Sequence, residues 1–390
     1  MSQISKSNTK PIVLALSSLY ALRMLGLFLI YPVFAVYGMQ LPGATPFLIG
    51  LALGVYGLSQ AILQIPFGML SDKFGRKPII IIGLLLFALG SIIAALSEDI
   101  YGLIWGRILQ GTGAITAVIT ALLADLLPSE QRSKAMAMVG LTIGLAFGLS
   151  LILAPLLAAA VGLSGMFWMI TGLIFLSLLV LIFFVPEPLK MHKPITQGEW
   201  RAVFQNKQLW ILNISVFFLH ALLTSSFLWL PQQLNEVTSA LYQQSLVYLF
   251  LLMGSYMLMM PILIRAEKTY QQKRVVQACI LGFAVAMLYF AFMPSTLGYL
   301  LLGLLLFLIP FNLLEAILPA WVSRLVPQHT RGAAMGMYAT WQFLGIFTGG
   351  IVTGWVLNYF SIYWVFLSFS VLMLIWFIIV RGLKRLTKQE

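Results

Sequence analysis

The sequence contains few charged residues and almost no cysteine. Charged side chains make up 9% of the 390 residues and apolar side chains 61%, whereas soluble domains average about 25% and 45–50%. A soluble domain of this composition would have too little polar surface to cover its core, so a soluble globular protein is excluded. The one cysteine, Cys279, excludes an internal disulfide and a cysteine-based metal site.

Motifs for enzymatic chemistry are missing as well. The sequence has no G-x-x-x-x-G-K-[ST] phosphate-binding loop, no nucleophile elbow, and no cluster of histidine, cysteine and carboxylate residues at metal-ligand spacing. It also lacks the alternating ten-residue strands of an outer-membrane barrel. We therefore expect no enzymatic activity, no cofactor and no ATP-driven step.

Long apolar stretches dominate the sequence instead. Each is about 20 residues or longer, the length that an α-helix needs to cross the hydrocarbon core of a membrane. The first, from about Pro11 to Tyr37, is too long for a signal-peptide core and has no small-residue cleavage site after it. The pattern predicts an all-α polytopic membrane protein with twelve spans, centred near residues 24, 58, 87, 112, 147, 174, 222, 254, 284, 311, 345 and 371.

Among the loops between these spans, only alternate ones contain lysine or arginine. The remaining loops contain Glu98, Asp99 and Glu236 and no cation. By the positive-inside rule, we expect a multi-pass membrane protein with both termini cytoplasmic. The net charge of +12 therefore reflects topology, and we expect the lipid bilayer but no nucleic acid as a partner.

The two halves of the sequence repeat each other. The stretch Ala124–Arg132 aligns with Ser323–Arg331, and Pro66 aligns with Pro261. Such self-similarity predicts two pseudo-symmetric six-helix bundles related by an axis along the membrane normal. We place them at 1–185 and 209–390, with a cytoplasmic linker at 186–208. The later part of the linker, around Trp200, is either a short amphipathic helix on the inner surface or a plain tether.

The polar stretch Gly68–Pro78, which reads GMLSDKFGRKP, separates the second and third predicted spans. It resembles the loop signature G-x-L-x-D-r-x-G-r-k of the major facilitator superfamily, whose members have twelve helices and work by alternating access. The stretches Gly54–Gln60 and Phe311–Ala316 further resemble the YajR-type drug:proton antiporters. Members of that type have a soluble C-terminal domain, which we do not expect here because the sequence ends about ten residues beyond the last predicted span.

The resemblance implies a cytoplasmic latch around this loop. Gly68 would allow close approach to another backbone, and Gly75 would supply freedom in φ. Asp72 would cap the start of the eleventh helix at 331–333, and Arg76 would pair with Asp125. The latch as a whole comprises Gly68, Asp72, Gly75, Arg76, Lys77, Asp125 and Arg132. A solvated loop without such a role is the alternative.

Two helices contain further family-like patterns. Arg107–Gly113 on the fourth helix resembles the family pattern R-x-x-Q-G-x-G, which implies that Arg107 organises the proton pathway. The alternative is a structural ion pair, because an arginine this deep in the membrane is costly without a partner. On the fifth helix, Gly144, Gly148 and Pro155 resemble the antiporter signature. Alanine replaces three of its glycines, and small residues at this spacing can also simply permit close helix packing.

Ionisable residues inside the apolar segments are candidates for proton coupling. We expect Glu315 to be buried on the tenth helix, where a carboxylate could bind and release protons near neutral pH and attract a cationic substrate. Arg23 on the first helix could instead hold this carboxylate permanently charged. His220 on the seventh helix could also transfer the proton, or be a hydrogen-bonded packing residue.

A third group of residues is predicted to line the substrate cavity. On the second helix, Tyr56, Gln60 and Gln64 form one polar stripe at helical spacing, which should face the cavity. The full set is Tyr31, Tyr56, Gln60, Gln64, Gln110, Asn312, Trp341 and Gln342.

These patterns favour a monomeric proton-coupled antiporter that exports small lipophilic or cationic compounds, as in multidrug efflux, with the proton gradient as its energy source. One alternative is a proton symporter or facilitator that takes up a small nutrient. Another is a membrane sensor or assembly partner that transports nothing.

Overall fold

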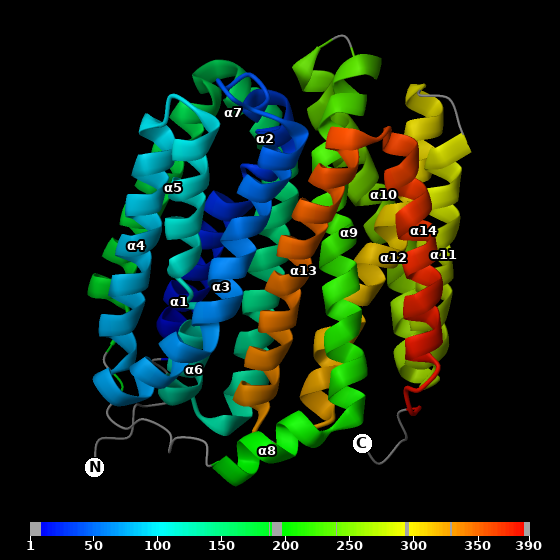
Figure 1. Ribbon diagram of the computed structural model, residues 1–390. Coiled ribbons are helices and arrows are strands. Elements are labelled where there is room, and N and C mark those ends of the chain that lie inside the picture. The colour runs from blue at the N-terminus through cyan, green and yellow to red at the C-terminus, as the bar shows by residue number, and fades with distance from the viewer. Residues whose placement is uncertain are drawn as a thin grey trace, which may run out of the picture. The chain divides into compact units, whose positions relative to one another are not determined.

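The structure, a computed structural model, describes residues 9–186, 188, 197–238, 240–292, 296–327 and 330–385. These residues form helices joined by short turns, and no strand occurs among them (Figure 1). In chain order the helices are α1 (Thr9–Phe28), α2 (Tyr31–Gly38), α3 (Pro46–Phe74), α4 (Arg76–Leu96), α5 (Ile100–Thr112), α6 (Thr116–Leu126), α7 (Ser129–Phe184), α8 (Gln197–Gln205), α9 (Lys207–Val237), α10 (Leu241–Lys268), α11 (Gln272–Phe292), α12 (Leu297–Arg324), α13 (Arg331–Tyr359) and α14 (Ile362–Val380).

Eleven helical segments among the described residues are long and apolar enough to cross a membrane. One of them combines α1 with α2, and another combines α5 with α6. The segment on α7 contains two helices, because Gly162 adopts φ 65° and ψ −177° inside it. Gly162 therefore separates the predicted fifth and sixth spans, and every predicted span has a helical counterpart.

The chain forms two compact units. Unit 1 consists of Met1–Ala44 and Leu58–Pro194, and unit 2 consists of Thr45–Gly57 and Ile195–Glu390. Much of the predicted linker, residues 187 and 189–196, lies outside the described residues. Its later part forms α8, so the helix expected there is present rather than a plain tether.

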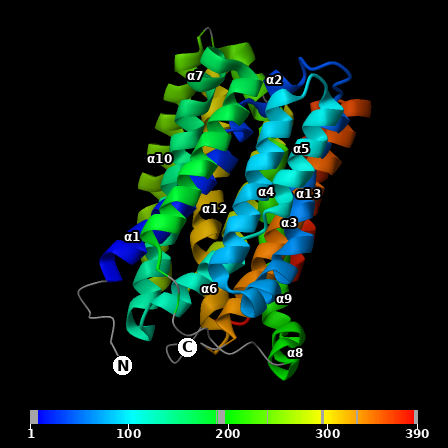
Figure 2. The ribbon, with the colours of Figure 1, turned by 90° about the vertical axis from the view of Figure 1, so that its left-hand side faces the viewer.

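In unit 1, α1 packs against α7, and α4 packs against α5 and α7. The approach of α4 to α5, visible in Figures 1 and 2, depends on glycine. A Cβ atom built on Gly90 would lie 2.3 Å from the Gln110 backbone nitrogen, and one on Gly106 would lie 2.7 Å from the Ala94 backbone nitrogen. Only glycine at these two positions lets the helices come so close.

In unit 2, α9 packs against α13, and α11 packs against α12 and α14. Glycine again determines the closest contact. A Cβ atom on Gly345 would lie 2.2 Å from the Phe217 carbonyl oxygen, and one on Gly349 would lie 2.2 Å from the Ala221 carbonyl oxygen. The backbones of α9 and α13 are therefore in direct contact on either side of His220.

The fifth-span residues predicted from the antiporter signature lie on α7. Pro155 is buried inside this helix, and Gly144 and Gly148 are half-buried. The structure places all three on one continuous helix, and their antiporter role stays a prediction.

Candidate functional site

His220 is at the centre of a polar cluster inside unit 2. Its Nδ1 lies 3.2 Å from the Val216 carbonyl oxygen, one turn earlier on α9. Its Nε2 lies 2.7 Å from the Gln342 amide nitrogen on α13 and 3.9 Å from the nearer Glu315 carboxylate oxygen on α12. Because a carbonyl can only accept, Nδ1 donates to Val216, and Nε2 accepts from Gln342.

Glu315 differs from the expectation in its burial. We predicted a buried carboxylate, but 43% of its side chain is exposed. The four preceding residues of α12 are buried, whereas Glu315 itself is exposed. Its carboxylate is therefore less enclosed than the imidazole beside it, whose side chain is 5% exposed.

Three further side chains surround this pair. The hydroxyl groups of Tyr256 on α10 and Tyr338 on α13 interact electrostatically with the Glu315 carboxylate. The Phe311 ring centroid lies 6.3 Å from that of His220. The cluster therefore joins four helices of one unit around an acid and a base.

Asn312 and Trp341, which we predicted to line the cavity, make packing contacts. Asn312 is buried, and its amide donates to the Ser255 hydroxyl at 3.0 Å, which ties α12 to α10. The Trp341 ring packs edge-on against Trp210 and Phe217, at 5.5 and 6.0 Å between centroids.

Arg23 is fully buried in unit 1, where it binds the break between α5 and α6. Its guanidinium donates to the Thr116 hydroxyl at 3.0 Å and to the Gly113 carbonyl at 3.4 Å. Tyr20, one turn earlier, donates to the Thr116 carbonyl at 2.7 Å. Among the described residues, no carboxylate forms a salt bridge with Arg23.

Arg107 and Gln110 belong to a second buried network in unit 1. Arg107 donates to the Gln110 amide oxygen at 2.7 Å, and the Gln110 amide nitrogen donates to the Ser91 hydroxyl at 2.7 Å. The predicted burial of Arg107 is confirmed. Gln110 is completely enclosed where α4 and α5 approach each other, and its place in a substrate cavity stays a prediction.

The other predicted cavity residues are also buried. Tyr31 is 3% exposed, Tyr56 and Gln60 are 0% exposed, and Gln64 is 1% exposed. The Gln60 amide donates to the Gly113 carbonyl at 3.4 Å, the same acceptor that Arg23 uses. Neither polar atom of the Gln64 amide has a hydrogen-bond partner among the described residues, which is costly for a buried amide.

The loop between α3 and α4 contains the pairing implied by the family resemblance. Arg76 Nε lies 2.9 Å from a carboxylate oxygen of Asp125, and both side chains are buried. The same guanidinium also binds Asp72 at 2.5 Å and the Ser71 hydroxyl at 2.6 Å. Gly75 adopts φ 96°, which confirms its expected conformational role.

The remaining residues of the predicted latch have separate contacts. Lys77 donates to the Val185 carbonyl at 2.8 Å, and Arg132 donates to the Leu127 carbonyl at 3.1 Å. A Cβ atom on Gly68 would meet nothing within 4 Å, so the close approach expected there is absent from this structure. The predicted contact of Asp72 with 331–333, and the latch itself, stay predictions.

Unit 2 contains a counterpart of this loop, which keeps charged residues but has no glycine and no aspartate. When Pro66 is aligned with Pro261, Glu267 occupies the position equivalent to Asp72, and Tyr270 the position equivalent to Gly75. Glu267 binds Arg324 at 3.2 Å, and Tyr270 adopts φ 54°, the one positive φ outside glycine among the described residues. Both turns therefore contain a residue with positive φ, although the turn in unit 2 has tyrosine in place of glycine.

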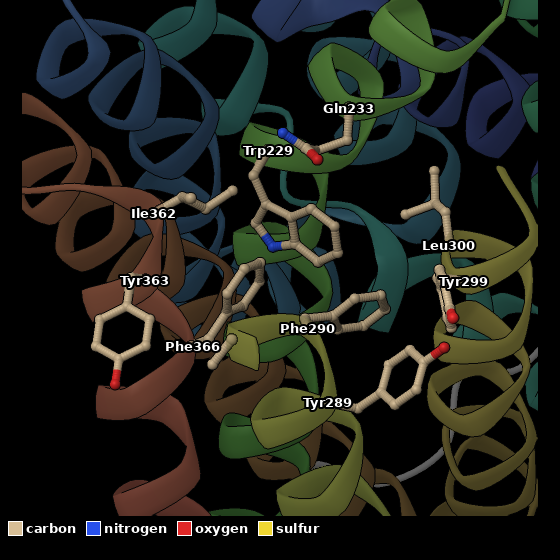
Figure 3. A pocket seen from close by; sticks show the side chains of 10 residues that line it. Trp229, Gln233, Tyr289, Phe290, Tyr299, Leu300, Ile362, Tyr363 and Phe366 are labelled. Atoms are coloured by element: carbon tan, nitrogen blue, oxygen red, sulfur yellow. The ribbon is translucent and has the colours of Figure 1, made fainter. Parts of the chain in front are cut away.

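Unit 2 also contains a pocket of about 200 Å³ at one end of α9, α11, α12 and α14. Figure 3 shows the Trp229, Phe290 and Phe366 rings gathered at this pocket, with the Gln233 amide beside them. Gly303 on α12 makes room for the Phe290 ring, because a Cβ atom there would lie 2.4 Å from that ring. The sequence gives no signal for this pocket, since aromatic residues are frequent throughout the chain.

Paired helical units, buried arginines and a charged loop at a left-handed glycine together define a polytopic membrane transporter. The family model described as Major Facilitator Superfamily matches residues 16–311 and 238–390. The chain belongs to this superfamily.

Individual relatives agree with this assignment. The chain is 40% identical over 373 residues to the inner membrane transport protein YajR of Escherichia coli K12, covering 95% of this chain and 82% of the relative. It is 37% identical over 90 residues to the multidrug resistance protein MdtH of Proteus mirabilis HI4320, covering 23% and 22% of the two chains. A solved D-xylose–proton symporter has the same fold, with a TM-score of 0.77 and 16% identity over 96% of this chain and 98% of that one. The protein is thus a multi-pass inner-membrane transporter.

Proposed function

We propose that the protein is a proton-coupled antiporter that exports small lipophilic or cationic compounds by alternating access. The observation that supports this most directly is the His220–Glu315 pair, an enclosed base 3.9 Å from a half-exposed acid. Such a pair can hold a proton in one state and a cation in the other. The similarity of a short segment to a multidrug resistance protein points the same way.

In this proposal Glu315 takes a proton from outside, and the bound compound and the proton compete for the same carboxylate. Inward proton movement supplies about 1.4 kcal/mol per pH unit and about 2.3 kcal/mol per 100 mV. No cofactor is needed, and a monomer suffices. Arg23 and Arg107 act by holding the α5–α6 segment in place rather than by exchanging protons, since arginine stays charged.

The test is proton release from inside-out vesicles loaded with acridine orange, challenged with lipophilic cations, sugars and amino acids. We expect at least one lipophilic cation to dequench the dye with the wild type and not with Glu315→Gln. The matched control is Glu267→Gln, which removes an exposed carboxylate of the same unit and should leave dequenching intact.

The other outcomes are equally informative. Dequenching that survives Glu315→Gln keeps antiport and moves the proton site elsewhere. No dequenching by any compound, from protein shown to be folded, rejects drug export. The alanines that replace the antiporter glycines near Pro155 then favour the second candidate, uptake by symport, which right-side-out vesicles would reveal.

A further inference from the structure

Gln342 occupies a chemically unusual position in the α9–α13 contact. Its amide nitrogen is 2.7 Å from Nε2 of His220, the ring nitrogen that holds no proton in the neutral imidazole, because Nδ1 donates to Val216. Nε2 is therefore the atom that a proton would reach. Among polar side chains, an amide has both a donor and an acceptor to offer at this point.

We propose that Gln342 is a positioning residue that transmits the protonation state of His220 to α13. The proposal rests on the proposed proton coupling. With neutral His220, the Gln342 amide nitrogen donates to Nε2. When a carboxylic acid O–H of Glu315 transfers its proton to Nε2, the O–H bond breaks, an N–H bond forms, and an imidazolium faces a carboxylate. The N–H of the ring and the N–H of the amide then repel each other.

The arrangement has two ways to relieve this repulsion. The Gln342 amide can rotate by half a turn and present its oxygen to Nε2, or the ring N–H can turn to Glu315, 3.9 Å away. The Tyr338 hydroxyl, one turn before Gln342 on α13, has no hydrogen-bond partner among the described residues. It interacts electrostatically with the Glu315 carboxylate. Tyr256 on α10 is the other titratable group beside this carboxylate.

A change at Gln342 reaches the backbone of α13 because no side chain separates the two helices there. Gly345 and Gly349 on α13 contact the Phe217 and Ala221 carbonyls, which flank His220 along α9. In such a tight contact, a reversed hydrogen bond changes how the two helices pack rather than being absorbed by flexible side chains. Protonation of one ring is thereby coupled to the position of a helix.

The first test measures the tautomer directly. The full-length protein is labelled with ¹⁵N-histidine, and His220 is assigned by comparison with His192→Gln and His329→Gln. We expect a neutral ring protonated at Nδ1 in the wild type, and a mixture of tautomers in Gln342→Met, where nothing donates to Nε2. Asn312→Leu removes a nearby buried amide that bonds Ser255 instead, and should leave the tautomer unchanged. A ring protonated at Nε2 in the wild type, or no change in Gln342→Met, overturns the proposal.

The second test measures coupling with the compound that dequenches the wild type. Gln342→Met should move at least tenfold fewer protons per compound exported, a ratio that does not depend on how tightly the compound binds. Unchanged coupling overturns the proposal. If Gln342→Met does not fold, Gln342→Glu replaces it; its carboxylate accepts but does not donate, so we expect the ring to be protonated at Nε2, and a ring still protonated only at Nδ1 overturns the proposal. A wild type without any proton movement would reject the proposed antiport alone, because the tautomer result stands without it.

Discussion

At the scale of single residues, Arg76 shows how one cation organises a polar loop in an apolar protein. It is almost fully buried and binds two acids, Asp125 inside the unit and Asp72 nearer the surface. Removing one partner of a buried pair is far more costly than the pair's net contribution, because a desolvated charge remains. The loss of stability on neutralising one acid should therefore depend on whether the other acid is present.

We predict unequal and non-additive losses when these acids are neutralised. Asp125→Asn should lower stability by about 3 kcal/mol because it leaves a buried cation with one acid. Asp72→Asn should cost less than about 1 kcal/mol because Asp72 is partly exposed. The double variant should lose at least about 0.5 kcal/mol more than the sum. Thermal unfolding in detergent measures all three, and strict additivity would contradict the shared role of Arg76.

Contacts between particular residues could be predicted from the sequence only where the family resemblance implied them. The Arg76–Asp125 pair is an example. The exposure of Glu315 could not be predicted, because hydropathy describes a whole segment and not the exposure of one side chain within it. The hydrogen bond of Gln110 with Ser91 could not be predicted either, because it depends on how α4 packs against α5.

At the scale of helices and turns, glycine positions determine the closest packing. Gly349 on α13 contacts the α9 backbone, whereas Gly336 on the same helix has no atom within 4 Å of an added Cβ. Sequence alone could not distinguish these two glycines, because both lie in the same apolar pattern. Hydropathy likewise contained no signal for the α5–α6 break at 113–115, which Arg23 and Gln60 bind through one carbonyl.

The two glycines make a matched pair for mutation. We predict that Gly349→Ala destabilises the protein by about 1–3 kcal/mol, because its methyl group would collide with the Ala221 carbonyl. Gly336→Ala should be neutral or stabilise by up to about 1 kcal/mol, because alanine favours a helix. Equal unfolding temperatures for the two variants would show that the α9–α13 contact is looser than described.

The paired turns allow a second comparison between elements. Tyr270 has φ 54° where its counterpart Gly75 has φ 96°, and a left-handed conformation costs a side chain about 1–2 kcal/mol. Tyr270→Asn should therefore raise the unfolding temperature, since asparagine tolerates this region. Gly75→Ala should lower it. A fall with Tyr270→Asn would mean that the tyrosine ring contributes more than its backbone strain costs.

At the scale of the whole molecule, the distribution of cations predicts which ends of the helices are cytoplasmic. The helical spans themselves were predictable, since twenty-residue apolar stretches leave few alternatives. Sidedness depends on the membrane and is still a prediction. The chain suits labelling experiments because its single cysteine, Cys279, is buried.

We predict the sidedness of two engineered cysteines in a Cys279→Ser background. Glu98→Cys should react with a membrane-impermeant maleimide in intact cells with a permeable outer membrane. Lys268→Cys should react only in inside-out vesicles. The reverse pattern would place both termini outside and contradict the positive-inside assignment.

The central claim, that protons and substrate move in opposite directions, can be tested by the sign of one signal. The purified protein is reconstituted into liposomes that contain pyranine and a compound that dequenches acridine orange, and the outside is then diluted. Antiport predicts that the lumen acidifies as the compound leaves, and that Glu315→Gln abolishes the change. A lumen that becomes alkaline would demonstrate symport, and a constant pH with continuing efflux would demonstrate uncoupled transport; either result would contradict the account.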